Sequence, residues 1–529
     1  MVDGHDDRGW PLMVLQLKRR VTQRHFVGWA VYAVAFSIGA IYRAIPEALI
    51  GIYPAGFETI AHYAPGIMEL KSKGLCFVAG RLANGLIFYF LMWLIINLTN
   101  ASTFAVLKVT GPILYGFLAA SYLFFLREGL GFDEKTSLAA TCVCISLPIC
   151  MRIGWDRFVN MTGLIPMFLS LGFLGRKEKT KRHWYVIAVL SLLTILSREL
   201  VASVMLAAQT GYFLMTKEER RYVFPILVTC YCAFAIVILP CLGIHFFPED
   251  ERFLILPPNP TKAFYPLSIL INYFPEGFSK SAYVRLCIRI LSLFAYAYLP
   301  IAPFLMRGIF RSRLMDFMVL WLLTGGLINP LVFPFISIPC FQRWQTMLVF
   351  PFCAYVANSL SRLRARLCSR KGHDAALIII VIPYLILASL YTSGLISWES
   401  EWTPPNLVQS SIGVNQIDDC IACVKWLNEN AVSGACLIIE ERFRGWVLLY
   451  LKREDIKIAV YGAPGTRIAD DFKRAYDAVV KAGFKVVYTI WYSYLELEIK
   501  DFTKIYSYGN IAIYQAELPI SFSTSCTSM

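Results

Sequence analysis

Three short stretches of the sequence combine ionisable side chains with aromatic, proline and glycine residues at the edges of long apolar runs. The first is GIYPAGFETIAHY (51–63), in which Glu58 precedes His62 and Tyr63. Residues four apart share one face of a helix, so Glu58 and His62 are expected to lie side by side. A carboxylate at a membrane surface loses hydration, which raises its pKa toward the range of a general base. Glu58 is therefore the first catalytic candidate.

The second stretch is RIGWDRFVN (152–160), which we expect to form a loop between two membrane spans. Asp156 stands between Arg152 and Arg157. One interpretation is an ion pair that neutralises itself at the membrane interface. The other is a second catalytic acid opposite Glu58, with an arginine, Arg152, free to hold a phosphate or a sugar.

The third stretch is PCFQRWQTM (339–347), at the expected outer end of another span. Arg343 and Trp344 stand together there. A guanidinium can bind a lipid phosphate through two parallel hydrogen bonds, although an arginine that only snorkels to the interface is the alternative. Arg198 and Glu199 are interpreted as a structural charge pair.

Cysteines and known catalytic motifs add no further site. The 15 cysteines are scattered, without the spacing of a zinc site. The CxxC at 420–423 lies in a helical pattern and is interpreted as packing, with redox or metal chemistry as the alternative. No Walker, HExxH or GxSxG motif is present.

Composition shows what must position these residues. The chain has 529 residues, of which 57% are hydrophobic and only 16% charged, and its mean hydropathy is +0.56. Continuous apolar runs of about 20 residues predict a polytopic α-helical membrane protein rather than a barrel. The net charge of +14 comes from basic blocks between these runs, which set membrane orientation and do not indicate a nucleic-acid partner.

The basic blocks fix the predicted topology. They are the N-terminal KRRVTQRH and the blocks at 176–183, 217–221, 307–313 and 361–373, and all five should be cytoplasmic. The number of crossings between two cytoplasmic blocks must be even. This requires that 81–98 does not cross but lies as a helix on the outer membrane surface, within a long outer loop at 44–101. About eleven crossings follow, near 26–43, 102–126, 136–151, 158–175, 184–197, 199–216, 222–245, 284–306, 314–333, 346–360 and 375–396. The outward loops are then 44–101, 150–158, 246–282, 334–345 and the part after 397.

The composition changes after residue 396. Strands are predicted at ACLIIE, IKIAVY, FKVVYTIWY and NIAIYQ, and they alternate with three helical patterns. Such alternation predicts an α/β domain with a largely parallel sheet. The chain is therefore divided into a transmembrane domain (1–396) and an extracytoplasmic α/β domain (397–529), which is interpreted as a cap or docking module. No glycine-rich phosphate loop occurs at its strand-to-helix turns.

The stretches YRAIPEALIGIYPAGFETIAHYAPGI and SLPICMRIGWDRFVNMTGLI, with Arg343-Trp344, resemble the GT-C superfamily of membrane glycosyltransferases. That superfamily includes oligosaccharyltransferase catalytic subunits and protein mannosyltransferases. The resemblance implies transfer of a sugar from a polyprenyl-phosphate-linked donor to a glycan, lipid or protein acceptor on the outer face of the membrane. It also implies that Glu58 is the catalytic acid, Asp156 the second-loop acid and Arg343 the lipid-phosphate anchor.

Two departures from the family pattern bear on metal use. Glu58 replaces the commoner aspartate, and Ile60 leaves it without a paired acid. This favours a metal-independent, mannosyltransferase-like enzyme, while a divalent cation such as Mg or Mn stays open.

Two other functions were weighed against the enzyme. A transporter or flippase of lipid-linked glycans predicts two pseudo-symmetric halves with broken helices. The chain has one long early loop and one C-terminal domain, which favours the enzyme. A noncatalytic membrane receptor is the third possibility.

Overall fold

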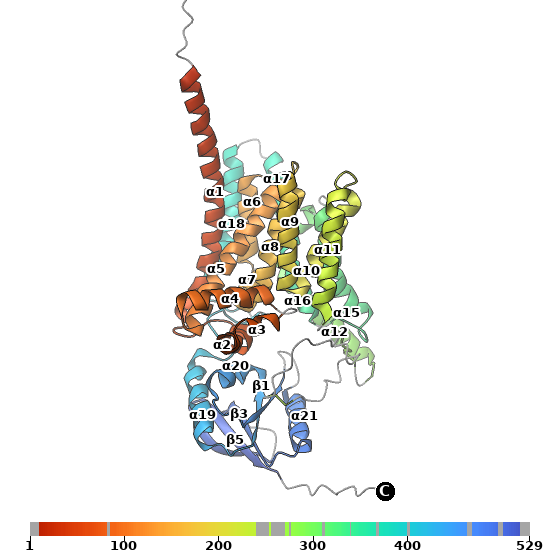
Figure 1. The fold of residues 1–529 in the computed structure, drawn as a ribbon. Coiled ribbons are helices and arrows are strands. Elements are labelled where there is room, and N and C mark those ends of the chain that lie inside the picture. Colours follow the sequence, from red (N-terminus) through yellow and green to blue (C-terminus); the bar gives the residue numbers. More distant parts are fainter. Residues whose placement is uncertain are drawn as a thin grey trace, which may run out of the picture.

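The computed structural model describes residues 10–81, 85–239, 253–254, 270–274, 277–308, 313–338, 340–366, 370–398, 403–462, 468–495 and 501–518. Most of these residues form an upright helical bundle with a small sheet beneath it (Figure 1). The helices of the bundle and its lower rim are α1 (Trp10–Leu49), α2 (Ala64–Lys73), α3 (Leu75–Ala79), α4 (Leu86–Thr99), α5 (Thr103–Phe124), α6 (Glu134–Ser146), α7 (Pro148–Asp156), α8 (Phe158–Gly175), α9 (Lys181–Ser197), α10 (Glu199–Met215), α11 (Arg220–Ile238), α12 (Lys280–Tyr298), α13 (Ala302–Gly308), α14 (Arg313–Leu323), α15 (Asn329–Val332), α16 (Phe341–Met347), α17 (Val349–Arg366) and α18 (Arg370–Thr392).

The helices have the length and composition of a polytopic membrane protein, as predicted. Seven helices in the described part of the chain are long and apolar enough to cross a membrane, or eight if the bent pair α6 and α7 counts as one span. Helices α9 and α10 have only 17 residues each. The predicted number of about eleven crossings therefore stays a prediction. The predicted outer loop 246–282 lies largely outside the described residues.

The predicted span 136–151 is not straight. The chain bends by 70° between α6 and α7, where Leu147 is extended and Pro148 starts the new helix. The segment RIGWD therefore belongs to helix α7 and is not part of a loop, which corrects that expectation. As a result, Asp156 sits at the C-terminal end of a helix beneath the bundle.

Helix α4 runs across the lower end of the bundle and not along it (Figure 1). This is the orientation predicted for a surface helix at 81–98. One side of α4 packs on the protein, whereas Phe90, Leu91, Leu94 and Leu98 are exposed. Exposed apolar side chains along one side of a crosswise helix suit the interface of a bilayer.

The C-terminal part contains a five-stranded sheet with the order β2-β1-β3-β5-β4. Strand β1 pairs in parallel with β2 and β3, while β5 pairs antiparallel with β3 and β4. The four predicted strands are present, and β4 is an additional strand that was not predicted. The sheet is mixed, which corrects the expectation of a largely parallel sheet. The elements are α19 (Ile417–Asn430), β1 (Cys436–Glu440), α20 (Glu441–Tyr450), β2 (Lys457–Tyr461), α21 (Ile468–Lys481), β3 (Val486–Tyr492), β4 (Thr503–Tyr508) and β5 (Ile511–Glu517).

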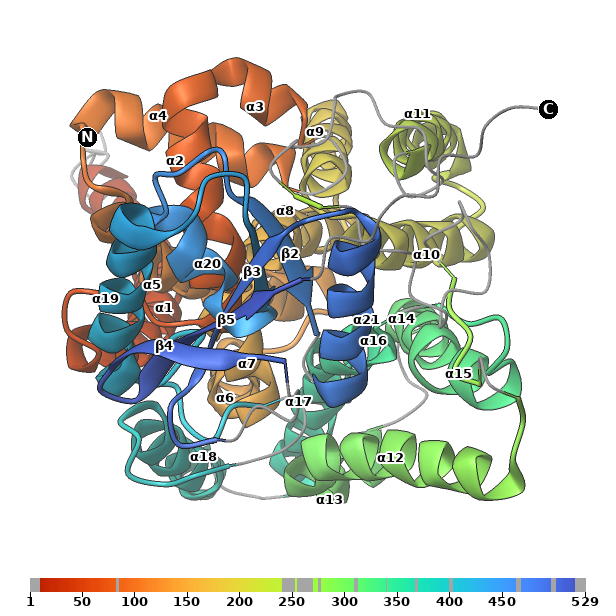
Figure 2. The same cartoon turned by 90° about the horizontal axis from the view of Figure 1, so that it is seen from below.

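The sheet lies at the end of the bundle opposite the start of α1 (Figure 1), and from below it covers the centre of the bundle (Figure 2). Helix α20 joins the two parts, because Gly445 packs directly on the backbone of the 51–63 segment. A Cβ atom at Gly445 would lie 1.9 Å from the carbonyl oxygen of Ile60. The carboxyl end of β1, from which α20 starts, therefore faces the segment that carries Glu58.

Candidate active site

The two segments that carry Glu58 and Asp156 are held together by an arginine of α1. The Nε of Arg43 donates to the carbonyl of Gly154 at 2.8 Å, and its Nη2 donates to Ala55 at 3.1 Å and Trp155 at 3.0 Å. Glu47, one turn later, pairs with Arg43 at 2.6 Å. The arginine is 2% exposed, so this is a buried charge with matched partners. It fixes the 51–63 segment against the end of α7.

Glycine at position 56 permits this close approach. Gly56 has a φ of +115°, and a Cβ atom there would lie 2.7 Å from the carbonyl oxygen of Trp155. Residues with a side chain rarely adopt that conformation. The residue that follows the turn, Glu58, is thereby brought to Asp156, because the backbone N–H of Glu58 donates to Oδ2 of Asp156 at 3.3 Å.

Glu58 pairs with Arg343, a residue 285 positions later in the chain. Its Oε1 lies 3.2 Å from Nη2 of Arg343, and its Oε2 accepts a hydrogen bond from the Tyr63 hydroxyl at 3.4 Å. The side chains of Glu58 and Arg343 are 20% and 32% exposed. The two candidates predicted to act together are thus in direct contact and still reachable from outside.

Asp156 is fully buried and pairs with Arg152 four residues earlier. Arg157 donates to the hydroxyl of Thr346 at 3.0 Å, and Thr346 donates to the carbonyl of Arg343 at 2.8 Å. Arg157 therefore supports the helix that carries Arg343. Three guanidinium groups surround two carboxylates, which leaves an excess of one positive charge.

This charge balance reverses the expected pKa of Glu58. Burial alone raises the pKa of this carboxyl group, but Arg343, Arg157 and Arg152 together lower it to about 2. The expectation of a raised pKa was wrong, because the sequence did not show how many arginines converge there. Glu58 in turn raises the pKa of Arg343, so both groups are fully ionised at neutral pH.

The remaining predicted residues have different surroundings. His62 lies 3.4 Å from Glu441 of α20 and does not pair with Glu58, and burial lowers its pKa. Tyr63 is buried and stacks on Phe158, with its hydroxyl on Glu58.

Trp344 packs on Gly325, where a Cβ atom would lie 2.3 Å from the indole, and so it anchors α16. Arg198 and Glu199 form a charge pair at 3.2 Å. The charge of Arg198 acts on the pKa of Tyr63, and that of Glu199 acts on the pKa of Arg343.

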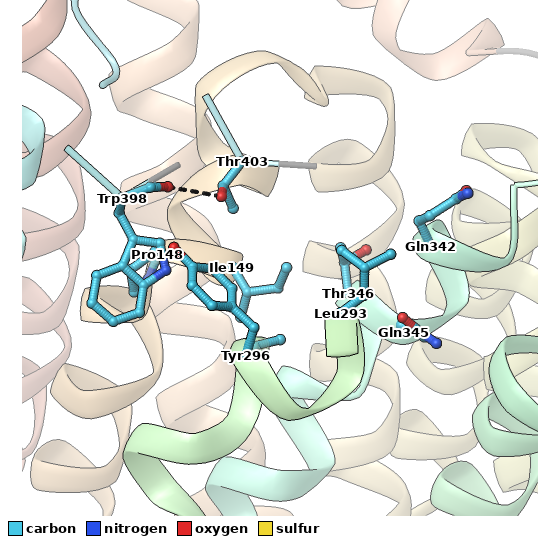
Figure 3. Close-up of a pocket in the computed structure, with 10 residues that line it drawn as sticks. Pro148, Ile149, Leu293, Tyr296, Gln342, Gln345, Thr346, Trp398 and Thr403 are labelled. Atoms are coloured by element: carbon cyan, nitrogen blue, oxygen red, sulfur yellow. Dashed lines mark hydrogen bonds between the residues drawn. The ribbon is translucent and has the colours of Figure 1, made fainter. Parts of the chain in front are cut away.

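A pocket lies beside α16 (Figure 3). Ile149 and Tyr296 line its apolar wall, while Gln342, Gln345 and Thr346 come from α16 itself. Its remaining lining residues are Pro148, Leu293, Ala297, Trp398 and Thr403. Thr346 belongs both to this pocket and to the hydrogen bonds that hold Arg157 and Arg343. The pocket and the ion pair therefore share one supporting helix.

The donor set does not fit a divalent cation. Glu58 and Asp156 are each paired with a guanidinium, and among the described residues no group of three or more His, Cys, Asp or Glu side chains converges. Magnesium and manganese bind several oxygen ligands, and nearby arginines repel them. A metal at Glu58 is therefore not supported by these residues.

Three important residues were not singled out from the sequence. Arg43 and Glu47 stand four apart at the end of the first apolar run, and this spacing was the available signal for a buried ion pair. Glu441 directly follows a predicted strand, and side chains at the carboxyl end of a parallel strand commonly form binding sites. That signal, however, did not reveal that the edge faces Glu58.

Comparison with known proteins supports the fold. No family model matches the chain, and no curated protein matches it in sequence. The chain is similar in structure to the oligosaccharyltransferase of Archaeoglobus fulgidus in complex with zinc and sulfate, at 13% identity and a TM-score of 0.53, over 87% of this chain and 67% of that chain. This similarity shows that the chain shares the fold of this oligosaccharyltransferase, an enzyme of the kind that the predicted resemblance includes.

Two further solved structures are similar at a lower level. ArnT from Cupriavidus metallidurans in the apo state has 11% identity and a TM-score of 0.49, over 94% of this chain and 98% of that chain. The arabinofuranosyltransferase AftD from Mycobacteria has 13% identity and a TM-score of 0.46, over 93% of this chain and 42% of that chain.

Proposed function

We propose that the chain is a membrane glycosyltransferase that moves a sugar from a polyprenyl-phosphate-linked donor to an acceptor hydroxyl on the outer face of the membrane. The observation that carries this proposal is the contact between Glu58 and Arg343, 3.2 Å apart. It joins a carboxylate that can take a proton to a guanidinium that can hold a phosphate. The fold shared with an oligosaccharyltransferase supports the same reaction class.

The donor phosphate binds at Arg343. The site has more guanidinium than carboxylate groups, so it attracts an anion, and a bidentate guanidinium suits a phosphate. Arg157 supports α16 through Thr346 and adds positive charge behind it. The apolar wall with Ile149 and Tyr296 offers the first prenyl units of the donor a surface next to the same helix.

The reaction needs a base and a stabilised leaving group. The acceptor oxygen attacks the anomeric carbon, the bond from that carbon to the phosphate oxygen breaks, and the electron pair stays on the polyprenyl phosphate. Glu58 takes the acceptor proton, while Arg343 stabilises the phosphate charge as it develops. Asp156 is a positioning residue in this proposal, because it is buried and binds the backbone of Glu58.

The ion pair also makes Glu58 sensitive to the donor. With a pKa of about 2, Glu58 is a weak base while Arg343 faces it alone. A phosphate bound to Arg343 offsets the charge of the guanidinium, and the pKa of Glu58 then rises toward its ordinary value. The base becomes effective only when the donor is in place.

A transfer assay tests the proposal. Membranes with the wild-type chain or Glu58→Gln receive a radiolabelled polyprenyl-phosphate-linked sugar, and labelled acceptor is measured. Loss of a general base should lower the transfer rate by about 10²- to 10⁴-fold. The matched control is Glu69→Gln, which removes a partly exposed carboxylate of α2 that pairs with Lys73.

Undiminished transfer by Glu58→Gln would overturn the assignment of Glu58. Movement of the labelled lipid between the leaflets by the wild-type chain, without transfer, would instead favour a flippase.

A further inference from the structure

Four buried polar atoms gather at the carboxyl edge of the C-terminal sheet, outside the site described above. They are Oε2 of Glu440, the hydroxyl of Tyr461, Oγ1 of Thr489 and Nε1 of Trp491. None of these atoms has a hydrogen-bond partner among the described residues. Buried polar groups are nearly always paired, because an unpaired one loses its hydration without compensation. Four such atoms in one place require an explanation.

The strand register brings the four side chains together on one face. Glu440 of β1 is aligned with Tyr461 of β2, and Ile438 is aligned with Thr489 of β3. Aligned residues of neighbouring strands point to the same face, and so do residues two apart on one strand. Trp491, two residues after Thr489, therefore joins the row that crosses β2, β1 and β3.

The cluster is buried but has an open rim. Glu440, Tyr461 and Thr489 are at most 6% exposed, whereas Trp491 is half-buried. Arg442 forms the rim: its Nε lies 2.9 Å from Oε1 of Glu440, and its side chain is 45% exposed. Burial raises the pKa of Glu440, so this carboxyl group gains from a hydrogen-bonded partner.

The atom types select the ligand. A carboxylate oxygen, two hydroxyls and an indole N–H offer both donors and acceptors, and the rings of Tyr461 and Trp491 offer flat apolar faces. A buried carboxylate repels a phosphate, and an indole N–H repels a cation. A carbohydrate fits, since its hydroxyls donate and accept and its C–H faces pack on aromatic rings.

The position of the edge relates it to the Glu58 segment. Glu440 directly precedes Glu441, which contacts His62, and the helix that follows packs on Ile60. In parallel sheets, ligands commonly bind outside the carboxyl ends of the strands, where connections leave in opposite directions. Strand β1 has β2 on one side and β3 on the other, so its carboxyl end is such a point.

We propose that this edge is a carbohydrate-binding subsite, in which Glu440, Tyr461, Thr489 and Trp491 hold hydroxyl groups of a glycan acceptor near Glu58. That the bound glycan is the acceptor rests on the proposed transferase function. Carbohydrate binding by the edge does not rest on it.

Binding is tested with the full-length chain in a detergent without sugar headgroups, applied to a printed glycan array. The best-bound glycan is then titrated in solution against the wild-type chain, Tyr461→Phe and Thr489→Val. Each substitution removes one unpaired polar atom and keeps the shape of the side chain. We expect at least tenfold weaker binding, together with a melting temperature that is unchanged or higher. Tyr508→Phe, the same change on the exposed strand β4, is the control and should bind as the wild type does.

Several results would overturn this proposal. The first is that the wild-type chain binds no glycan, and the second is that wild-type and Tyr461→Phe protein bind equally well. The third is that the variants melt at a lower temperature with unchanged binding, which would show a purely structural role. Peptide binding that both substitutions weaken would overturn the carbohydrate assignment as well. The two proposals fail separately: normal transfer by Glu58→Gln would refute the catalytic role of Glu58, whereas equal glycan binding by the wild-type chain and Tyr461→Phe would refute the subsite.

Discussion

The strength of the Glu58–Arg343 ion pair can be predicted and measured by a double-mutant cycle. The perturbations are Glu58→Gln, Arg343→Gln and the double variant, compared with the wild-type chain. The two charged atoms lie 3.2 Å apart, and the side chains are 20% and 32% exposed. Exposed pairs contribute at most about 1 kcal/mol, and breaking a fully buried pair costs about 3 to 5 kcal/mol. We therefore expect a coupling free energy of about 1 to 3 kcal/mol at pH 7.

The pH dependence of this coupling is the sharper test. A carboxyl group whose pKa is lowered on folding stabilises the protein fully above its unfolded pKa, and this stabilisation is lost progressively as the pH falls from the unfolded to the folded value. The pKa of Glu58 falls from 4.5 to about 2. The coupling should therefore be complete at pH 7, smaller but still present at pH 4, and lost only near pH 2.

The assay is unfolding in mixed micelles, followed by a thiol-reactive dye that reports exposure of buried cysteines. Glu69 and Lys73, which are 2.6 Å apart with Lys73 58% exposed, form the control pair. Their coupling should stay below about 0.5 kcal/mol and decrease with salt. A Glu58–Arg343 coupling as small as that of the control pair would refute the reasoning, and so would a coupling lost with a midpoint near pH 4.5.

Three further outcomes are expected. Arg43→Gln removes hydrogen bonds to three carbonyls and leaves Glu47 without its partner, so it should lower the free energy of unfolding by about 3 to 5 kcal/mol. A loss below about 1 kcal/mol in chemical unfolding would contradict the role of Arg43 in holding the two segments together. Gly445→Ala places a Cβ atom 1.9 Å from the carbonyl oxygen of Ile60, so it should lower the free energy of unfolding by about 1 to 3 kcal/mol and reduce transfer. Gly163→Ala, whose nearest contact lies at 3.4 Å, is the control and should be tolerated in the same thermal and transfer assays. Burial lowers the pKa of His62 from 6.5, so the wild-type chain should lose stability relative to His62→Gln as the pH falls below about 6.5. Melting temperatures of the two proteins that change with pH in the same way would rule this out.

The sequence predicted the membrane class, the crosswise helix and the strands because each depends on local pattern. Charge parity placed Glu58, Asp156 and Arg343 at one end of the chain's helices, where they lie together. The pKa of Glu58 could not be predicted, because it depends on three arginines from two segments that are distant in the sequence. The bend between α6 and α7 was also missed, since an apolar run reads as one span unless the proline at 148 is taken as a break.

Strand β4 was missed for a related reason. It is the edge strand, and its residues are mostly exposed, so it lacks the apolar signal of the buried strands. The cluster around Glu440 depends on the register of three strands, and a single sequence does not state which strands are neighbours.

The clamp formed by Arg43 has a consequence for how such a site can evolve. All three of its hydrogen bonds to the 51–63 segment and to α7 end on main-chain oxygens, at positions 55, 154 and 155. Every amino acid supplies that oxygen, so side chains near these positions can be exchanged without releasing the segments from α1. Side chains around the site can therefore change by substitution while the 51–63 segment stays fixed against the end of α7.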